Sequence, residues 1–224
     1  GVSQLANQYN RFHDKGVQKM SPLTILQTIH NSASSVLSIE HKIKGLSSGY
    51  NCMETSGVEA FCDALMLLDS PDYQDIFIGA GEDLNNENQT LEQIGSVFLL
   101  TKRIPQNQNT YFDIKCLINR GKPWLNPNEN LWDVLNTHFG NNSNDKTAKV
   151  EKEKWIIFNF QDFQKDFLLN YPIDIVEFPA FKSFLSVAPF LGISMGMQLY
   201  TEFKLLTIST EGHAVLISFK KVDY

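Results

Sequence analysis

Short runs of branched and aromatic residues alternate with helical repeats along most of this chain, and this alternation limits the folds that it can adopt. A short apolar or alternating run bounded by turn-forming residues is typical of a β-strand. The strands expected on this basis are Asp75–Ala80, Gly95–Thr101, Thr110–Ile118, Trp155–Phe160, Ile173–Val176, Lys204–Ser209 and His213–Phe219. Because only Thr210-Glu211-Gly212 separates the last two, we expect them to form a hairpin.

Apolar residues at helical spacing predict helices between these strands. Val58, Phe61 and Cys62 begin one such face, which continues to Leu68, and Ser56-Gly57 stands at its start. The other expected helices are a weak amphipathic one within residues 1–20, one helix or a broken pair of helices from Ser21-Pro22 to about Ile39, and Asn126–Gly140, Gln161–Leu169 and Lys182–Thr201. Strands and helices in this order favour an α/β protein of stacked layers, with helices buried between sheets.

Residues 141–154, reading NNSNDKTAKVEKEK, form the most solvated segment of the chain. Such a run of polar and charged residues has the composition of a linker. We therefore expect the main internal boundary here, between an N-terminal half at 1–140 and a reduced C-terminal half at 155–224.

The charge balance argues against nucleic acid as a partner. The chain has 19 Lys and Arg against 25 Asp and Glu, and no run of basic residues is long enough to concentrate a positive field. No apolar run approaches the roughly 20 residues that cross a bilayer, so we expect no membrane span. Since no basic and apolar leader pattern follows Gly1, the expected compartment is the cytoplasm.

The residue types that usually hold metals or nucleotides are dispersed. None of the 5 His has another ligand three or four residues away, and the 3 Cys form no CxxC pair, so we expect no metal site. The glycines form neither GxGxxG nor a phosphate-binding loop, so no cofactor is expected. The cysteines, Cys52, Cys62 and Cys116, are interpreted as reduced and mostly buried small hydrophobes.

A block of motifs runs without a gap from Ala33 to Asp83. Ile43-Lys44-Gly45 ends a helical segment, Met53–Ala60 reads METSGVEA, Asp63-Ala64 follows, and Ile76–Asp83 reads IFIGAGED. In this order and spacing the block resembles the centre of the β-ketoacyl-acyl-carrier-protein synthases. The corresponding motifs of that family read LKG, then ACASG or ACATG, then DA and VMVAGGAE.

The resemblance continues on both sides of this block. Ser21–Thr24 with Thr28–Asn31 looks like the SPTxF…HN segment of the ketosynthases and ketosynthase-like subunits of aryl-polyene and flexirubin pathways, and Gly95–Leu100 and Gly212–Ile217 resemble later strands of the family. It implies a thiolase-like layered α/β/α/β/α fold, with 1–140 and 155–224 as ketosynthase-like halves. Because the family has a strand-helix region ahead of the first matching segment, the resemblance also implies a fold shortened at the N-terminus.

The main departure from the family is Glu54, which stands where the ketosynthases have their nucleophilic cysteine. That cysteine lies at the head of a buried helix, whose dipole favours the thiolate. A carboxylate does not form the thioester, so transacylation should be lost. Cys52 lies two residues earlier and should point to the opposite side of an extended segment. The two catalytic histidines of the family have no counterpart at Gln161-Asp162 or within Phe184–Ala188.

These departures predict a catalytically silent ketosynthase-like subunit of the chain-length-factor type. The resemblance implies that it pairs with an active ketosynthase, or with itself as a homodimer, and works with an acyl carrier protein in fatty-acid or polyketide-type polyene biosynthesis. We expect no catalytic residue, with Glu54 as a plug or an interface group and His30 as a structural donor. The expected residues of the substrate tunnel or interface are His30, Asn31, Cys52, Met53, Glu54, Thr55, Ser56 and Gly57.

Two other interpretations stay open. In the first, the chain is a ketosynthase relative with residual malonyl-carrier decarboxylase, hydrolase or acyl-transfer activity, and Glu54 is its base, because burial can raise the pKa of a glutamate into a useful range. The lack of candidate histidines weighs against it. In the second, the chain is a plain α/β scaffold in which Glu54 caps a helix and the glycines allow close packing.

Overall fold

The computed structural model describes residues 2–23, 32–51, 53–85, 91–102, 110–121, 127–139, 152–158, 168, 170–177, 187–209 and 213–223. Its contacts divide the chain into two compact units. The first is Gly1–Asn51 with Asn85–Glu92, and the second is Cys52–Leu84 with Gln93–Tyr224. We describe each unit by itself.

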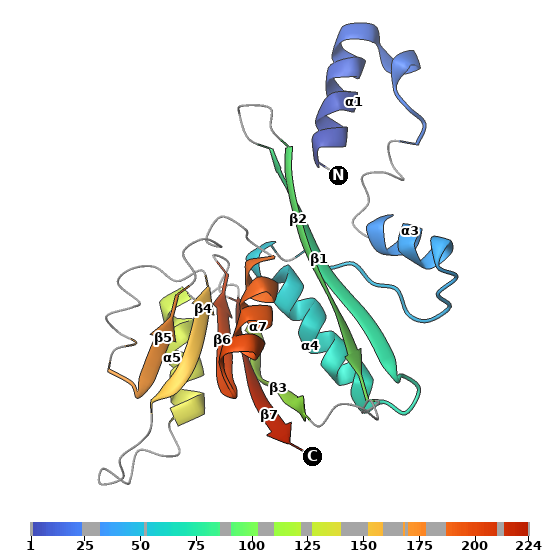
Figure 1. Cartoon of the computed structure of the whole chain (residues 1–224). Coiled ribbons are helices and arrows are strands. Elements are labelled where there is room, and N and C mark those ends of the chain that lie inside the picture. Colours follow the sequence, from blue (N-terminus) through green and yellow to red (C-terminus); the bar gives the residue numbers. More distant parts are fainter. Residues whose placement is uncertain are drawn as a thin grey trace, which may run out of the picture. The chain divides into compact units, whose positions relative to one another are not determined.

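The described part of the first unit contains the helices α1 (Val2–Lys15) and α3 (Ser32–Glu40) and the 3-10 turn η1 (Val17–Lys19) (Figure 1). α1 is the amphipathic helix expected within residues 1–20. It ends at Gly16, whose φ of 76° is a conformation that glycine adopts without strain. The Gly16 N–H donates to the carbonyl oxygen of Phe12 at 2.9 Å, which closes the last turn.

At Ser21-Pro22, where the sequence predicts the start of a helix or of a broken pair of helices, the described residues are not helical. Ser21, Pro22 and Leu23 form a turn instead, in which the Ser21 hydroxyl accepts the N–H of Leu23 at 3.2 Å. A serine followed by proline suits a turn as well as a helix start, and here the turn forms. α3 begins at Ser32, and residues 24–31, including His30 and Asn31, lie outside the described residues.

A five-stranded sheet in the order β3-β7-β6-β4-β5 is the centre of the second unit. Its strands are β3 (Thr110–Gly121), β4 (Glu153–Phe158), β5 (Ile173–Val176), β6 (Glu202–Ile208) and β7 (His213–Asp223). β4 is parallel to both β5 and β6, while β7 is antiparallel to β6 and β3. The predicted hairpin is therefore confirmed as β6 and β7, with its turn at 210–212 outside the described residues.

Both faces of this sheet are buried, because helices pack on each of them. Side chains along each strand alternate between the two faces. The helices of this unit are α4 (Ser56–Asp69), α5 (Pro127–Phe139) and α7 (Ala188–Leu199). Ile156 and Leu205 belong to a core cluster with residues of α4 and α7. Trp155 and Leu206 belong to a second cluster with residues of α5. Figure 1 shows α5 on one side of the sheet and α7 and α4 on the other.

A separate two-stranded sheet consists of β1 (Asp75–Asn85) and β2 (Leu91–Thr101). Ile78 and Leu100 are buried in the same cluster as the residues of α4 and α7, whereas Phe77 is 68 % and Val97 is 71 % exposed. The unit is thus layered as β1–β2, then α4 with α7, then the five-stranded sheet, then α5. This is the α/β architecture that the alternation of strands and helices predicts, with helices buried between two sheets.

Several strands are longer than their apolar runs. β1 continues to Asn85, five residues past the expected strand, β2 begins at Leu91, four residues before it, and β3 continues to Gly121. β4 begins at Glu153, two residues before the predicted strand and inside the segment predicted as a linker. The ends of these strands consist of polar residues, so an apolar pattern does not predict them. Their backbone N–H and C=O groups can still form hydrogen bonds with a neighbouring strand.

Other expected bounds also change. α7 ends at Leu199, short of Thr201, and begins at Ala188, while residues 178–186 lie outside the described residues. Of the helix expected at Gln161–Leu169, only Leu168 is described, and it is helical. The five-stranded sheet joins β3, before the predicted linker, to β7, after it. The division into halves at 141–154 stays a prediction, since residues 140–151 are outside the described residues.

Two glycines let α7 lie directly on the sheet. A Cβ added at Gly192 would lie 2.5 Å from Cε2 of Phe158, and one added at Gly196 would lie 2.5 Å from Cε2 of Phe203. The Phe203 ring has little room to move aside, because it stacks on Phe219 with a centroid distance of 4.6 Å. The position of α7 therefore depends on the absence of a side chain at these two residues.

Candidate functional site

The motif segment METSG forms the beginning of the buried helix α4. Met53–Thr55 make the 3-10 turn η2, and α4 starts at Ser56 directly after it. η2 contacts both β6 and β7 of the large sheet. The side chains of Val58 and Phe61 then face the core at helical spacing, which fixes the orientation of the helix tip.

Glu54 lies on this turn and is only 8 % exposed, while Thr55 beside it is completely buried. Gly57 is buried and Ser56 is partly buried in the first turn of α4. For Met53 only the backbone is described, and Cys52, His30 and Asn31 lie outside the described residues. The structure thus brings Glu54, Thr55, Ser56 and Gly57 together at one helix end, and their role in a tunnel or interface stays a prediction.

Two residues that the sequence analysis did not select lie close to this helix end. Glu59, in the first turn of α4, faces His213, with Oε1 3.6 Å from Nδ1 of the imidazole. The backbone of His213 closes the β6–β7 hairpin, because its N–H donates to the Ser209 hydroxyl at 2.9 Å and its carbonyl accepts the Ser209 N–H at 2.8 Å. His213 is therefore fixed by the sheet, and its ring extends toward an acid of α4.

A pair of thiols lies further along the same helix. Cys62 of α4 and Cys116 of β3 are both free, with their Sγ atoms 3.1 Å apart. The hydrogen bond to Cys116 and burial raise the pKa of the Cys62 thiol, and the acids Glu59 and Asp63 add to the effect. The same hydrogen bond lowers the pKa of Cys116, although burial and the two acids oppose it. Cys62 is buried and Cys116 is partly buried, and that both are reduced stays a prediction.

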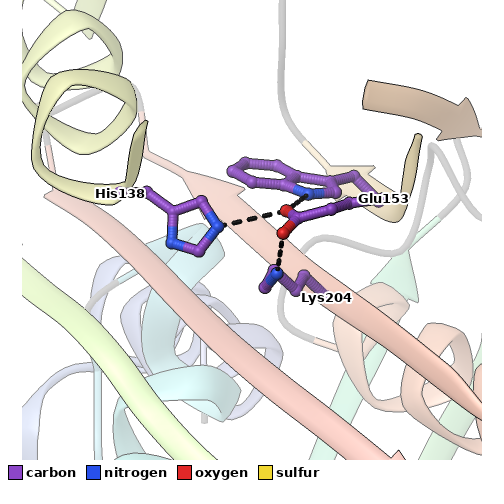
Figure 2. A network of polar contacts seen from close by, with 4 residues as sticks. His138, Glu153 and Lys204 are labelled. Atoms are coloured by element: carbon purple, nitrogen blue, oxygen red, sulfur yellow. Dashed lines mark hydrogen bonds and ion pairs between the residues drawn. The ribbon is translucent and has the colours of Figure 1, made fainter. Parts of the chain in front are cut away.

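A network of polar contacts lies on the face of the sheet that α5 covers, between α5, β4 and β6 (Figure 2). Glu153 of β4 is its centre. Its Oε2 accepts hydrogen bonds from the Trp155 indole at 2.9 Å and lies 3.1 Å from Nε2 of His138, while its Oε1 lies 2.7 Å from Nζ of Lys204. The Lys204 side chain is only 9 % exposed, so Glu153 neutralises a cation that is largely removed from water.

The electrostatics of Glu153 follow from these contacts. Burial alone raises the pKa of its carboxyl group, because it disfavours the charged form. The hydrogen bonds from His138, Lys204 and Trp155, together with the charge of Lys204, outweigh burial and lower the pKa of Glu153 to about 2. Glu153 is therefore ionised at neutral pH, and its contact with His138 links α5 to the sheet.

The described residues limit the chemistry that is available. In the ranges that the structure describes, no histidine hydrogen-bonds or pairs with a thiol, since His213 faces Glu59 and His138 faces Glu153. No group of three or more His, Cys, Asp or Glu in those ranges is placed to hold a metal ion. None of the described helices has the length and apolar character needed to cross a membrane.

A scan against protein-family models and a search of curated proteins gave no match. Solved structures, in contrast, match over nearly the whole chain. The complex of a type II PKS acyl-carrier protein with its ketosynthase bound to the hexaketide, AntDE:AntF in its apo form, has a TM-score of 0.73 and 14 % identity, and the match covers 98 % of this chain and 71 % of that one.

Two further structures match over the same share of this chain. A β-ketoacyl synthase from Burkholderia phymatum STM815 has a TM-score of 0.64 and 9 % identity and is covered over 72 % of its length. The ishigamide ketosynthase/chain length factor has a TM-score of 0.59 and 12 % identity and is covered over 69 % of its length. The expected fold class is thereby confirmed, since this chain has the thiolase-like layered α/β fold of the ketosynthases.

Proposed function

We propose that this chain is a catalytically silent ketosynthase-like subunit of the chain-length-factor type. It pairs with an active ketosynthase, or with a second copy of itself, and acts with an acyl carrier protein in cytoplasmic polyene biosynthesis of the aryl-polyene or flexirubin type. The single observation that carries the proposal is the buried Glu54 at the head of α4. This is the position at which the METSG motif aligns with the nucleophilic cysteine of the family.

The chemistry of a carboxylate at this position supports silence. The head of a helix favours an anion by up to about 1 kcal/mol, so both a thiolate and a carboxylate are stable there. A thiolate goes on to accept an acyl chain as a thioester, whereas acylation of a carboxylate gives a mixed anhydride that is no suitable acyl carrier. Glu54 can therefore occupy the place of the nucleophile without performing its reaction.

The titles of two structural neighbours support the partners. One neighbour is a ketosynthase/chain length factor, and another is a ketosynthase in complex with an acyl-carrier protein. A chain with the same fold and an acid in place of the nucleophile fits the role of the non-catalysing member of such a pair.

An acyl-loading experiment tests this assignment. The parent chain, Glu54→Cys and Asp69→Cys are each incubated with acyl-loaded carrier protein, and covalent acylation is followed by mass spectrometry of the intact proteins. We expect no adduct on the parent, an adduct on Glu54→Cys, and none above background on Asp69→Cys, whose thiol would lie at the exposed far end of the same helix. An acylated parent, or equal labelling of the two variants, would contradict the proposal.

Pairing is tested separately by co-expression with ketosynthases encoded beside this chain, followed by size-exclusion chromatography. We expect a stable complex with one of them or a homodimer. A chain that stays monomeric with every such ketosynthase would rule out the subunit role.

A second candidate function rests on the burial of Glu54. A buried carboxyl group at the head of a helix could act as a base in malonyl-carrier decarboxylation or in acyl transfer. Release of carbon dioxide from malonyl-loaded carrier protein by the parent, and its loss in Glu54→Gln, would favour this enzyme over the silent subunit. No turnover by the parent would dismiss it.

A further inference from the structure

We propose that Cys62 and Cys116 form an oxidisable thiol pair, which peroxide converts into a disulfide between α4 and β3. The basis is their geometry, since the two free Sγ atoms lie 3.1 Å apart with no atom between them. A disulfide bond of about 2.05 Å needs these atoms to approach by about 1 Å more. Cys62 belongs to the buried cluster that contains residues of α4, and Cys116 packs against that cluster. The two side chains are therefore already neighbours, and only a small movement is needed to bring the sulfurs together.

The backbone of β3 is irregular directly after Cys116. Cys116 pairs with Ile217 of β7, but the next pair is Ile118 with Leu216, so Leu117 is an extra residue on β3. Such a bulge locally weakens the ladder and bends the strand. The bulge lets β3 move toward α4 at Cys116, while the pairing of the rest of β3 with β7 keeps its register.

The two thiols differ in a way that assigns their roles. Cys62 is completely buried and donates its S–H to Cys116, whereas Cys116 is partly exposed. Cys116 is therefore the sulfur that an oxidant can reach, and the donated hydrogen bond favours its thiolate, which is the reactive form. Cys62 is positioned to resolve the oxidised intermediate. Glu59 and Asp63 disfavour negative charge on both sulfurs, so the pair should react more slowly than an isolated low-pKa thiol.

The reaction balances with peroxide as the oxidant. The Cys116 thiolate attacks one peroxide oxygen, the O–O bond breaks, and with one proton the products are a sulfenic acid and water. The Cys62 sulfur then attacks the sulfenic sulfur, the S–O bond breaks, and the Cys62 proton leaves with the hydroxide as a second water. Overall two thiols lose two electrons and two protons, and one hydrogen peroxide becomes two water molecules.

The disulfide bond would stabilise the unit that contains Glu54. It would join residues separated by 54 positions, and it would tie the helix that begins at Glu54 to the edge strand of the large sheet. Closing a loop of this length restricts the unfolded chain, so we expect the midpoint of thermal unfolding to rise by at least about 5 °C on oxidation.

The full-length parent chain is treated with hydrogen peroxide, remaining thiols are alkylated, and the protein is digested without reduction. Trypsin alone leaves Cys52 and Cys62 on one peptide, because no Lys or Arg lies between Gly45 and Thr101, so a protease that cleaves after glutamate is added to cut at Glu54 and Glu59. We expect a linked pair of peptides that contain Cys62 and Cys116, with Cys52 alkylated.

Matched variants separate the pair from the third cysteine. Cys52→Ser should give the same linked peptides and the same rise in the unfolding midpoint, whereas Cys116→Ser and Cys62→Ala should lose both. The peptide mapping of the parent decides the question even if Cys62→Ala fails to fold. Three alkylated cysteines after treatment, a disulfide that includes Cys52, or Cys116 oxidised only to sulfinic or sulfonic acid would each overturn the proposal.

Discussion

The two faces of the five-stranded sheet hold their helices by different means. On the α4 and α7 face, the Phe61 ring contacts the rings of Phe98, Phe190 and Phe219 with centroid distances of 6.0 to 6.1 Å, within a cluster of buried apolar residues. On the α5 face, an apolar cluster is joined at its end by the ionised network of Glu153 (Figure 2). The packing around Phe61 thus depends on shape, whereas the α5 face also depends on the charge of Glu153 and should respond to pH.

The largest effect is expected from Phe61→Ala on the aromatic face. Phe61 is completely buried, so its removal leaves a cavity among three other rings and should lower the free energy of unfolding by about 3–5 kcal/mol. Urea denaturation at pH 7 and at pH 4 measures the loss, which should be equal at both. Met66→Ala on the exposed side of the same helix is the control and should change stability by less than about 0.5 kcal/mol. Equal losses in the two variants would show that this face does not depend on packing.

A smaller loss is expected from adding one methyl group beneath α7. In Gly196→Ala the new Cβ would meet Cε2 and Cζ of Phe203 at 2.5 and 2.6 Å, so the helix or the stacked ring must shift. We expect a loss of about 1–3 kcal/mol, although alanine is the better helix former. Gln198→Ala, exposed on the same helix, should be neutral within about 0.5 kcal/mol. A Gly196→Ala variant that is stabilised would mean that α7 does not press on the sheet.

A smaller effect is expected from Glu153→Gln on the α5 face, and unlike the two losses above it should depend on pH. The pKa of Glu153 is lower in the folded chain, at about 2, than its ordinary value of 4.5, so folding favours the ionised form. This stabilisation is complete above the ordinary pKa and is lost as the pH falls from about 5 toward 2. The Glu153 side chain is partly exposed, so we expect a loss of about 1–2 kcal/mol at pH 7, which shrinks toward pH 3.

The exposed ion pair of Lys154 with Asp174, between β4 and β5, is the matched control for that variant. Asp174→Asn removes a carboxylate on the same sheet that water already solvates, so its effect should be smaller than that of Glu153→Gln and should fade with added salt. Denaturation curves from pH 7 to pH 3 for both variants decide the comparison. A loss in Glu153→Gln that stays constant over this range would show that the network does not act through charge.

Much of this fold was predictable from local patterns. The apolar runs of β5, β6 and β7 and the helical repeat of α4 each specify a local structure, and all of them form. Glu54 was also expected at the head of a helix, and it lies on the turn that opens α4. Its proposed role rests on chemistry that spacing alone does not determine.

The features that were missed depend on contacts between distant residues. Glu153 and Lys154 have the composition of a linker, yet they form a strand because β5 and Lys204 of β6 pair with them from far along the chain. The Cys62–Cys116 contact joins residues 54 positions apart, and no spacing rule relates them. Such pairs follow from the layering of the fold, so they become visible only after the strands and helices are assembled.

The two glycines of α7 have a consequence for how this sequence can vary. Because aromatic rings from the sheet touch the helix backbone at residues 192 and 196, a substitution at either position must be accompanied by a smaller residue at Phe158 or Phe203. The exposed Gln198 and Leu199 carry no such restriction. In chains descended from a common ancestor, we therefore expect positions 192 and 196 to change only together with their ring partners, while 198 and 199 diverge freely.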